Sequence, residues 1–200
     1  MKRGEQDKDR ETARTRLSAQ DWADAALAAV GEGGLAAIAV EPLATRLGAT
    51  KGSCYWHFAN RAALIEATLT RWEQIATDAV IVTAEADPDP DPEHRLRTLF
   101  ARVVIAASEN PVELALLSSA AHPQVAAALH RVTERRMEYV AVLFAELGFP
   151  REEARRRSLL AYSAYLGHAQ LAHSVPQLLP EGAERGRYLE STMAALLQRS

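Results

Sequence analysis

Prolines and glycines cut this chain into pieces of helical length, and this punctuation constrains the fold more than any other feature. Proline is poorly tolerated beyond the first turn of a helix, and it drives the residue before it towards an extended conformation. Between the breaks, apolar residues recur three or four positions apart, which is the spacing of an amphipathic helix. No segment alternates as a strand would, so the sequence predicts an all-α protein. The breaks lie at Gly33-Gly34, Gly48, Asp87–Pro92 (DPDPDP), Pro111, Pro123, Gly148–Pro150, Pro176 and Pro180.

About nine helices follow from these breaks. Ser18, Thr50 and Asn60 are each placed to accept a hydrogen bond from the first turn of the helix that begins after them. The second helix begins after Ala39, which has no side-chain oxygen for this purpose. Its Pro42 is compatible with a helix because it falls in the first turn. The predicted ranges are about 19–32, 40–47, 51–58, 61–84, 93–109, 111–121, 123–147, 151–174 and 183–198.

The composition of the 200-residue chain restricts its surroundings and its partners. A single cysteine excludes an internal disulfide framework and suits a reducing compartment. No apolar run approaches the ~20 residues of a transmembrane helix, and the charged N-terminal segment lacks the apolar core of a secretion signal. We therefore expect a cytoplasmic protein with no membrane partner. The net charge is −3, so a surface for nucleic acid would need its basic residues gathered in one place.

The sequence carries no motif for catalysis or metal binding. It has no Gly-x-Ser-x-Gly elbow, phosphate-binding loop, His-Glu-x-x-His or paired-cysteine motif, so we expect no enzyme activity and no cofactor. The acidic run at residues 87–92 is predicted to be a linker. An EF-hand calcium loop would need Gly and Glu where this chain has Pro92 and Thr98. His122, His168 and His173 lack i, i+4 spacing and a neighbouring cysteine, so we expect no metal site.

The third predicted helix, KGSCYWHF, holds four ring-bearing side chains in eight residues. On an ideal helix Cys54 and Phe58 share one face, and burial of that face turns Trp56 outward. Tyr55 and His57 then fall on the two flanks. An aromatic cluster on a short helix is more often part of a core. A short helix that follows a helix and a Gly-containing turn is, however, typical of a helix-turn-helix DNA reader, whose outer face meets bases and whose flanks meet phosphates.

Residues 17–64 resemble, without a gap, the DNA-binding domain of the TetR (tetracycline-repressor) family of bacterial transcription regulators. The matching residues include Ala25-Ala26-Leu27, Gly34, Val40 and the run Leu43–Leu64. The family pattern at the positions of Thr50–Phe58 begins with a hydroxyl residue, then Lys-Gly, then either Ser or Thr. It continues with an apolar residue, Tyr, any residue, either His or Tyr, and finally Phe. A basic residue, here Arg61, follows three positions later. We therefore divide the chain into a mobile arm at residues 1–16, a helix-turn-helix head at 17–62, and a helical ligand-binding and dimerisation body at 63–200.

The resemblance implies a set of DNA-contacting residues in the head. Two positions depart from the family pattern. Ala39 stands where the family often has Ser or Thr, so we expect one phosphate contact to be missing. Cys54 replaces a larger apolar residue, and we expect it to be a small buried hydrophobe, because a redox sensor needs an exposed thiolate. The implied phosphate contacts are Thr50, Lys51, Ser53, Tyr55, His57 and Arg61, and the implied base-facing positions are Lys51, Gly52 and Trp56.

The resemblance also implies a homodimer and a small-molecule effector site in the body. We expect dimerisation through the helices at 151–174 and 183–198, the first of which mixes small residues with leucines. For the dimer residues the alternative is the core of a monomer, and for the effector residues it is ordinary core packing. The dimer candidates are Leu159, Leu160, Ser163, Ala164, Gly167 and Leu171, and the effector candidates are Trp72, Phe100, Ile105, Met137, Phe144, Tyr162, His168 and His173.

The sequence thus favours a ligand-responsive repressor that binds a palindromic operator in double-stranded DNA as a homodimer and is released by a small molecule. Such a protein would be nucleoid-associated while bound to DNA. Two alternatives stay open. A transcriptional activator of the same family would look the same, because polymerase contact leaves no recognisable pattern. The chain could also be a helical small-molecule-binding or interaction module whose head no longer binds DNA.

Overall fold

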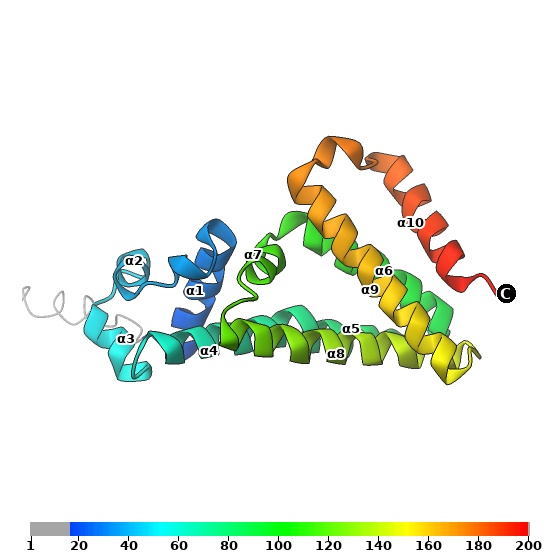
Figure 1. Ribbon diagram of the computed structural model, residues 1–200. Helices are drawn as coiled ribbons and strands as arrows, with labels where there is room; N and C mark the ends of the chain where they lie inside the picture. Colours follow the sequence, from blue (N-terminus) through cyan, green and yellow to red (C-terminus); the bar gives the residue numbers. More distant parts are fainter. Residues whose placement is uncertain (1–16, 200) are drawn as a thin grey trace, which may run out of the picture.

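The computed structural model describes residues 17–199, and the arm predicted for residues 1–16 lies outside them. Within the described residues every regular element is a helix, which confirms the all-α prediction. The head lies at one end of the molecule (Figure 1). It consists of α1 (Ala19–Gly33), the 3-10 turn η1 (Leu35–Ala37), α2 (Val40–Arg46) and α3 (Lys51–His57).

The predicted N-caps of the head are confirmed. The Ser18 hydroxyl accepts the N–H of Asp21 at 3.2 Å, and the Ser18 N–H donates to the Asp21 carboxylate at 2.7 Å. The Ser18 hydroxyl also donates to this carboxylate at 2.8 Å, and the two bonds that the carboxylate accepts lower the pKa of Asp21. Thr50 and Asn60 each accept the N–H of the third residue of the next helix, at 3.3 and 2.9 Å. α2 begins after Ala39 without a side-chain cap, as its sequence requires.

The long helix predicted for residues 61–84 is interrupted. It consists of α4 (Arg61–Glu73), a π-helical turn η2 (Gln74–Asp78) and α5 (Ala79–Glu85). In η2 the N–H of Ala79 bonds to the carbonyl of Gln74, five residues back. π-helical turns are rare in proteins, and those that occur are often found at functional sites. The two halves pack against different neighbours, α4 on α1 and α8, and α5 on α6.

The body packs against this rod. α8 (Pro123–Glu146) runs alongside α4 and α5, while α9 (Arg151–Ser174) rises from the far end of α8 and α10 (Gly182–Leu197) returns downward (Figure 1). α6 (Pro92–Glu109) lies behind α9, and α7 (Val112–Ser118) connects it back towards the head. A 3-10 turn, η3 (Pro176–Leu178), joins α9 to α10. The last aspartate of the acidic run, Asp91, caps α6, because its carboxylate accepts the N–H groups of Glu93 and His94.

Two hydrophobic cores hold the molecule together. The first contains the buried residues of the head, such as Trp22, and continues into Val112 and Leu116 of α7 and Val132 of α8. The second lies between α6, α8, α9 and α10, with Phe144 at its centre. The head therefore shares one continuous core with α7 and α8, so a movement of α7 is transmitted to the head by direct packing.

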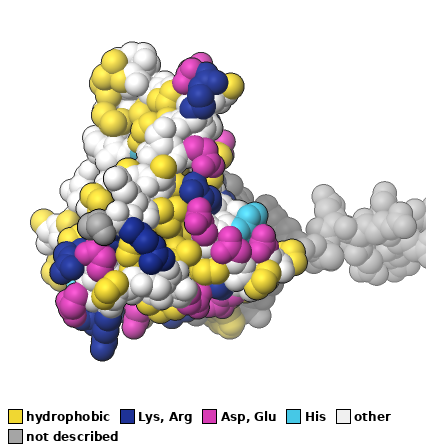
Figure 2. Space-filling model, turned by 90° about the vertical axis from the view of Figure 1, so that its right-hand side faces the viewer, with side chains coloured by type: hydrophobic (Ala, Val, Ile, Leu, Met, Phe, Trp, Pro, Cys, Tyr) yellow, Lys and Arg dark blue, Asp and Glu magenta, His cyan; other side chains and the backbone are white. Residues whose placement is uncertain are grey.

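At the end of the molecule opposite the head, hydrophobic and charged side chains are unevenly distributed over the surface. In the view from that end, hydrophobic side chains continue up the projecting part, while acidic and basic side chains are interleaved across the lower part (Figure 2). None of the described helices is both long and apolar enough to cross a membrane.

Candidate nucleic-acid interface and internal cavity

α3 divides its side chains between the core and solvent in the way that its sequence predicts. Cys54 and Phe58 are buried, with exposed fractions of 1% and 7%, and burial raises the pKa of the Cys54 thiol. Tyr55 and Trp56 are 54% and 66% exposed. The Trp56 ring stands edge-on to that of His57, with centroids 4.6 Å apart. A short helix thus presents two large aromatic side chains outward, where an intermolecular partner can reach them.

The basic side chains near α3 are held by exposed ion pairs. Lys51, at the start of α3, pairs with Glu41 of α2, and both side chains are more than half exposed. Arg46 of α2 pairs with Glu32 of α1. Exposed pairs of this kind contribute only about 0–1 kcal/mol to stability. Each cation can therefore exchange its carboxylate for a phosphate at little cost.

His57 and Arg61 anchor α3 within the head. The His57 ring lies with Nε2 2.8 Å from the carbonyl oxygen of Leu17. Arg61 Nε donates to the carbonyl of Ile38 at 2.7 Å, and its Nη2 donates to the carbonyl of Leu35 at 2.9 Å. These bonds tie the C-terminal end of α3 and the start of α4 to the residues before α1 and before α2. Both side chains therefore position α3, a role that the sequence pattern alone does not distinguish from phosphate contact.

Gly52 has room for a side chain within the chain itself. A Cβ at this position would meet the Thr50 hydroxyl at 3.7 Å, which is an ordinary contact. The backbone does not demand glycine either, because φ at Gly52 is not in the left-handed region. The glycine therefore leaves the outer face of α3 open, and close approach of a partner is the physical use of such an opening.

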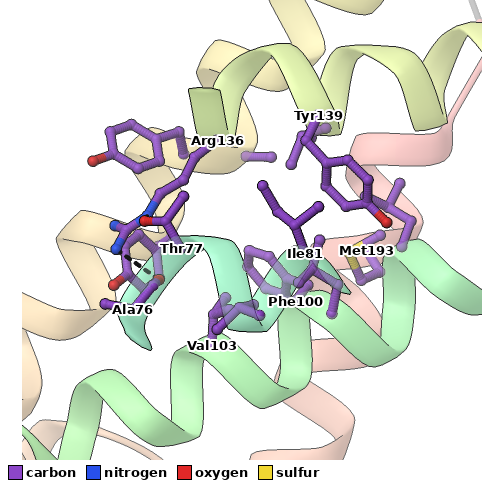
Figure 3. Close-up of a pocket in the computed structure, with 15 residues that line it drawn as sticks. Ala76, Thr77, Ile81, Phe100, Val103, Arg136, Tyr139 and Met193 are labelled. Atoms are coloured by element: carbon purple, nitrogen blue, oxygen red, sulfur yellow. Dashed lines mark hydrogen bonds between the residues drawn. The ribbon is translucent and has the colours of Figure 1, made fainter. Parts of the chain in front are cut away.

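An internal cavity of about 80 Å³ lies in the body, between η2, α5, α6, α8, α9 and α10. One end is apolar, where Ile81, Phe100 and Met193 converge (Figure 3). At the other end Arg136 reaches across to Thr77 (Figure 3). The cavity is smaller than the roughly 300–1,000 Å³ of most ligand pockets, so a ligand of ordinary size requires its walls to move apart.

A buried ion pair closes the polar end. Arg136 Nη1 donates to both carboxylate oxygens of Glu113, at 2.7 and 2.9 Å, and the two side chains are only 14% and 10% exposed. Tyr165 donates to the same carboxylate at 2.6 Å, and Tyr162 at 3.4 Å. Burial and the Glu113 charge raise the pKa of Tyr165, which keeps its hydroxyl protonated as a donor.

The guanidinium of Arg136 also braces the π-helical turn. Its Nε donates to the Thr77 hydroxyl at 2.9 Å, and its Nη2 donates to the carbonyl of Ala76 at 3.0 Å. Its central carbon lies 5.6 Å from the centre of the Trp72 ring on α4. Burial is the largest single effect and would lower the pKa of Arg136, but the charge and hydrogen bond of Glu113, together with Tyr165 and Tyr162, outweigh it and the pKa is raised. Arg136 therefore links α8 to the rod and, through Glu113, to α7.

The predicted effector residues are dispersed. Phe100 and Tyr162 line the cavity. Trp72 lies in the core shared with the head, Phe144 packs on Phe149, and Ile105 is 39% exposed. The remaining three lie elsewhere: Met137 borders a separate groove between α8 and α9, His168 stacks on Tyr188, and the His173 ring bonds to the carbonyl of Ala107 at 2.8 Å.

Sequence reasoning found Tyr162 but missed the other polar residues of the cavity, Arg136 above all. Arg136 stands four residues after Val132 and four before Val140, on the apolar face of α8. A charged residue at an apolar position signals a buried partner, because an unpaired buried charge is too costly. Arg136 could therefore have been found by periodicity. Its pairing with Glu113, Thr77 and Tyr165 could not, since those residues come from three other elements. Among the described residues no cluster of three potential metal ligands occurs.

The predicted dimer residues lie on one helix with a mixed exposure. Leu159, Leu160 and Leu171 of α9 are exposed, the first two by more than half. Ser163 and Gly167 are also exposed, whereas Ala164 is partly buried. The nearby arginines at 155–157 pair with Glu152 and Glu153.

Comparison with known proteins agrees with this geometry. Residues 23–68 match the family model described as bacterial regulatory proteins, tetR family. No curated protein matches the chain in sequence.

Several solved structures share the fold. A transcriptional regulator from Rhodococcus sp. RHA1 is 20% identical, with a TM-score of 0.70 over 90% of this chain and 94% of that chain. SmeT, the repressor of the Stenotrophomonas maltophilia multidrug efflux pump SmeDEF, is 22% identical, with a TM-score of 0.67 over 90% of both chains. BioQ, solved with its natural double-stranded DNA operator, is 18% identical, with a TM-score of 0.54 over 90% of this chain and 98% of that chain.

At these identities the structural likeness establishes the fold, and the match over residues 23–68 establishes the nature of the head. The head is therefore that of a bacterial regulatory protein of the tetR family, and the chain as a whole has the fold of solved transcriptional regulators.

Proposed function

We propose that the protein is a ligand-responsive repressor that binds a palindromic operator as a homodimer and is released by a small molecule held in its body. The observation that carries DNA binding is the exposure of Tyr55 and Trp56 on a helix whose opposite face is buried. Large apolar side chains on a short exposed helix are otherwise unfavourable, so a macromolecular partner explains them best. SmeT is a repressor and BioQ binds an operator, and both share the fold.

The exposed face of α3 would enter the major groove. Trp56 and Lys51 would face base edges, and Gly52 would allow the backbone to approach. Thr50, Ser53 and Tyr55 would donate to phosphates from the flanks. His57 and Arg61 would act mainly by fixing α3 against the rest of the head, since their nitrogens already bond to backbone carbonyls.

Dimerisation would use the exposed face of α9 together with α10. Leu159, Leu160 and Leu171 offer apolar area there, and Ser163 and Gly167 allow close approach of a second helix. Two heads held in this way would meet successive major grooves, about 34–36 Å apart on the DNA.

The cavity is the proposed effector site, since α5, α6, α8, α9, α10 and the turn η2 all contribute to its walls. A molecule that binds more tightly to an expanded cavity would favour the conformation of the dimer that has that cavity. Release from DNA follows if the two heads are wrongly spaced in that conformation.

A mobility-shift titration on the DNA upstream of the protein's own coding sequence tests the proposal. At low salt we expect a discrete shifted band that competitor DNA of unrelated sequence does not remove, and that weakens steeply as salt is raised. The Trp56→Ala variant should lose most of the shift while keeping the unfolding transition of the wild type. A wild-type protein that gives no shift at low salt would contradict DNA binding.

A further inference from the structure

We propose that the cavity in the body selects a compact, uncharged and mainly apolar effector, and that the Arg136–Glu113 pair makes it reject anions. This inference rests on the proposed function, because it names the class of molecule that would occupy the proposed effector site.

The first argument is the charge balance of the polar end. Glu113 accepts hydrogen bonds from Arg136, Tyr165 and Tyr162, and the formal charges of Glu113 and Arg136 cancel. Arg136 is already bonded to Thr77 and Ala76 as well. A carboxylate that entered the cavity would have to displace Glu113 or remain buried without a counter-charge, and both are costly. An uncharged molecule faces neither cost.

The second argument is the nature of the walls. Apart from Arg136, Thr77 and three tyrosines, the described residues that line the cavity are apolar. The Tyr165 hydroxyl is bonded to Glu113 and the Tyr162 hydroxyl to Thr133 and Glu113, so among the three tyrosines only the buried hydroxyl of Tyr139 is left for a polar group of a ligand. The space of about 80 Å³ is roughly half of the 150 Å³ cavity that holds benzene in another protein. A single substituted ring therefore fits only when the walls separate.

The third argument concerns what such a separation would move. Ala76 and Thr77 belong to the π-helical turn, which continues into α4 and so to the head. Glu113 belongs to α7, whose Val112 packs on α1: a Cβ added at Gly31 of α1 would lie 3.2 Å from the Val112 side chain. Arg136 holds these two routes together at the cavity wall. Expansion against Arg136 therefore strains both connections between the body and the head.

Calorimetric titration of the full-length protein with toluene and with benzoate tests the class of effector, because the two probes differ chiefly in charge. We expect toluene to bind and benzoate to bind at least 10-fold more weakly. In the Glu113→Gln variant, Arg136 loses its counter-charge, so the preference for toluene should shrink or reverse. Benzoate that binds wild type as tightly as toluene, or toluene that does not bind, would overturn the inference.

A second pair of variants keeps the test informative if Glu113→Gln fails to fold. Val103 of α6 lines the cavity, whereas Ile105, two residues on, is exposed. Val103→Phe should fill the space and abolish toluene binding, and Ile105→Phe should leave it unchanged. Equal toluene binding by both variants would place the site elsewhere and overturn the inference.

The operator titration is run separately on the same proteins. Val103→Phe should bind operator DNA as wild type does, and toluene should no longer weaken that binding. If wild type binds toluene but no DNA, the proposed regulatory function fails while the chemistry of the cavity stands. If wild type binds DNA but prefers benzoate, the function stands and the inference fails.

Discussion

Two cation–carboxylate ion pairs lie in different surroundings in this molecule. Lys51 and Glu41 meet on the surface of the head, with side chains 56% and 69% exposed, whereas Arg136 and Glu113 meet inside the body, at 14% and 10%. Water screens the first pair, so its formation changes the free energy of folding by only about 0–1 kcal/mol. The second pair is costly to break, because either partner alone would be a buried charge.

The difference in burial explains how each region can treat an incoming anion. Lys51 can leave Glu41 for a DNA phosphate, since the carboxylate is then solvated. Arg136 cannot leave Glu113 for a ligand carboxylate without leaving the buried Glu113 charge unpaired. The head is thus suited to reversible contact with a polyanion, and the body to an uncharged molecule.

The largest expected effect comes from breaking the buried pair. Arg136→Met leaves Glu113 without its counter-charge, so we expect the free energy of unfolding to fall by about 3–5 kcal/mol. Replacing both partners, as Arg136→Met with Glu113→Leu, should restore a large part of this loss, because no buried charge then remains. Urea unfolding of the three proteins measures the effect. Equal stability of the single variant and wild type would show that the pair is not buried as described.

Arg61 represents an intermediate case, since it donates to two backbone carbonyls at the edge of the head. Arg61→Ala should lower the free energy of unfolding by about 1–3 kcal/mol, because hydrogen bonds to charged groups are stronger than neutral ones. Arg135→Ala, which removes an exposed ion pair between α8 and Asp78, is the control and should cost about 1 kcal/mol or less. A smaller loss for Arg61→Ala than for the control would leave Arg61 as a phosphate contact only.

The sequence predicts the head far better than the body, and the reason is the range of the interactions. Ser18, Thr50 and Asn60 cap helices through bonds to residues three positions away, and the outward direction of Trp56 follows from the position of Cys54 and Phe58. Each of these depends on neighbours along the chain, so spacing alone predicts it.

The cavity depends instead on residues brought together by folding. Glu113 and Arg136 are 23 residues apart, and Arg136 and Thr77 are 59 apart. Helical periodicity places Phe100 and Tyr162 on inward faces but cannot distinguish a cavity wall from a packed core, which is why Phe144 and Trp72 were included with them. The π-helical turn cannot be predicted from the sequence either, because its residues are of the same types as those of an ordinary α-helix.

The smallest expected effect comes from loosening the exposed pair. Glu41→Gln should change the free energy of unfolding by no more than about 0.5 kcal/mol. Operator affinity should rise a few-fold at low salt, because Lys51 loses its competing carboxylate. Glu32→Gln, which frees Arg46 in the same manner, is the parallel control for a cation that lies on α2 rather than on α3. A fall in operator affinity for Glu41→Gln would show that Glu41 supports the DNA-bound state instead of competing with it.

The most direct test of the central claim, that the exposed face of α3 binds DNA, is the salt dependence of operator binding by wild type and Lys51→Ala. Fluorescence anisotropy with a labelled operator gives the slope of log K against log salt. If Lys51 neutralises a phosphate, its loss should make this slope shallower by about 0.9 while the unfolding transition stays in place. Identical slopes for the two proteins would contradict the claim.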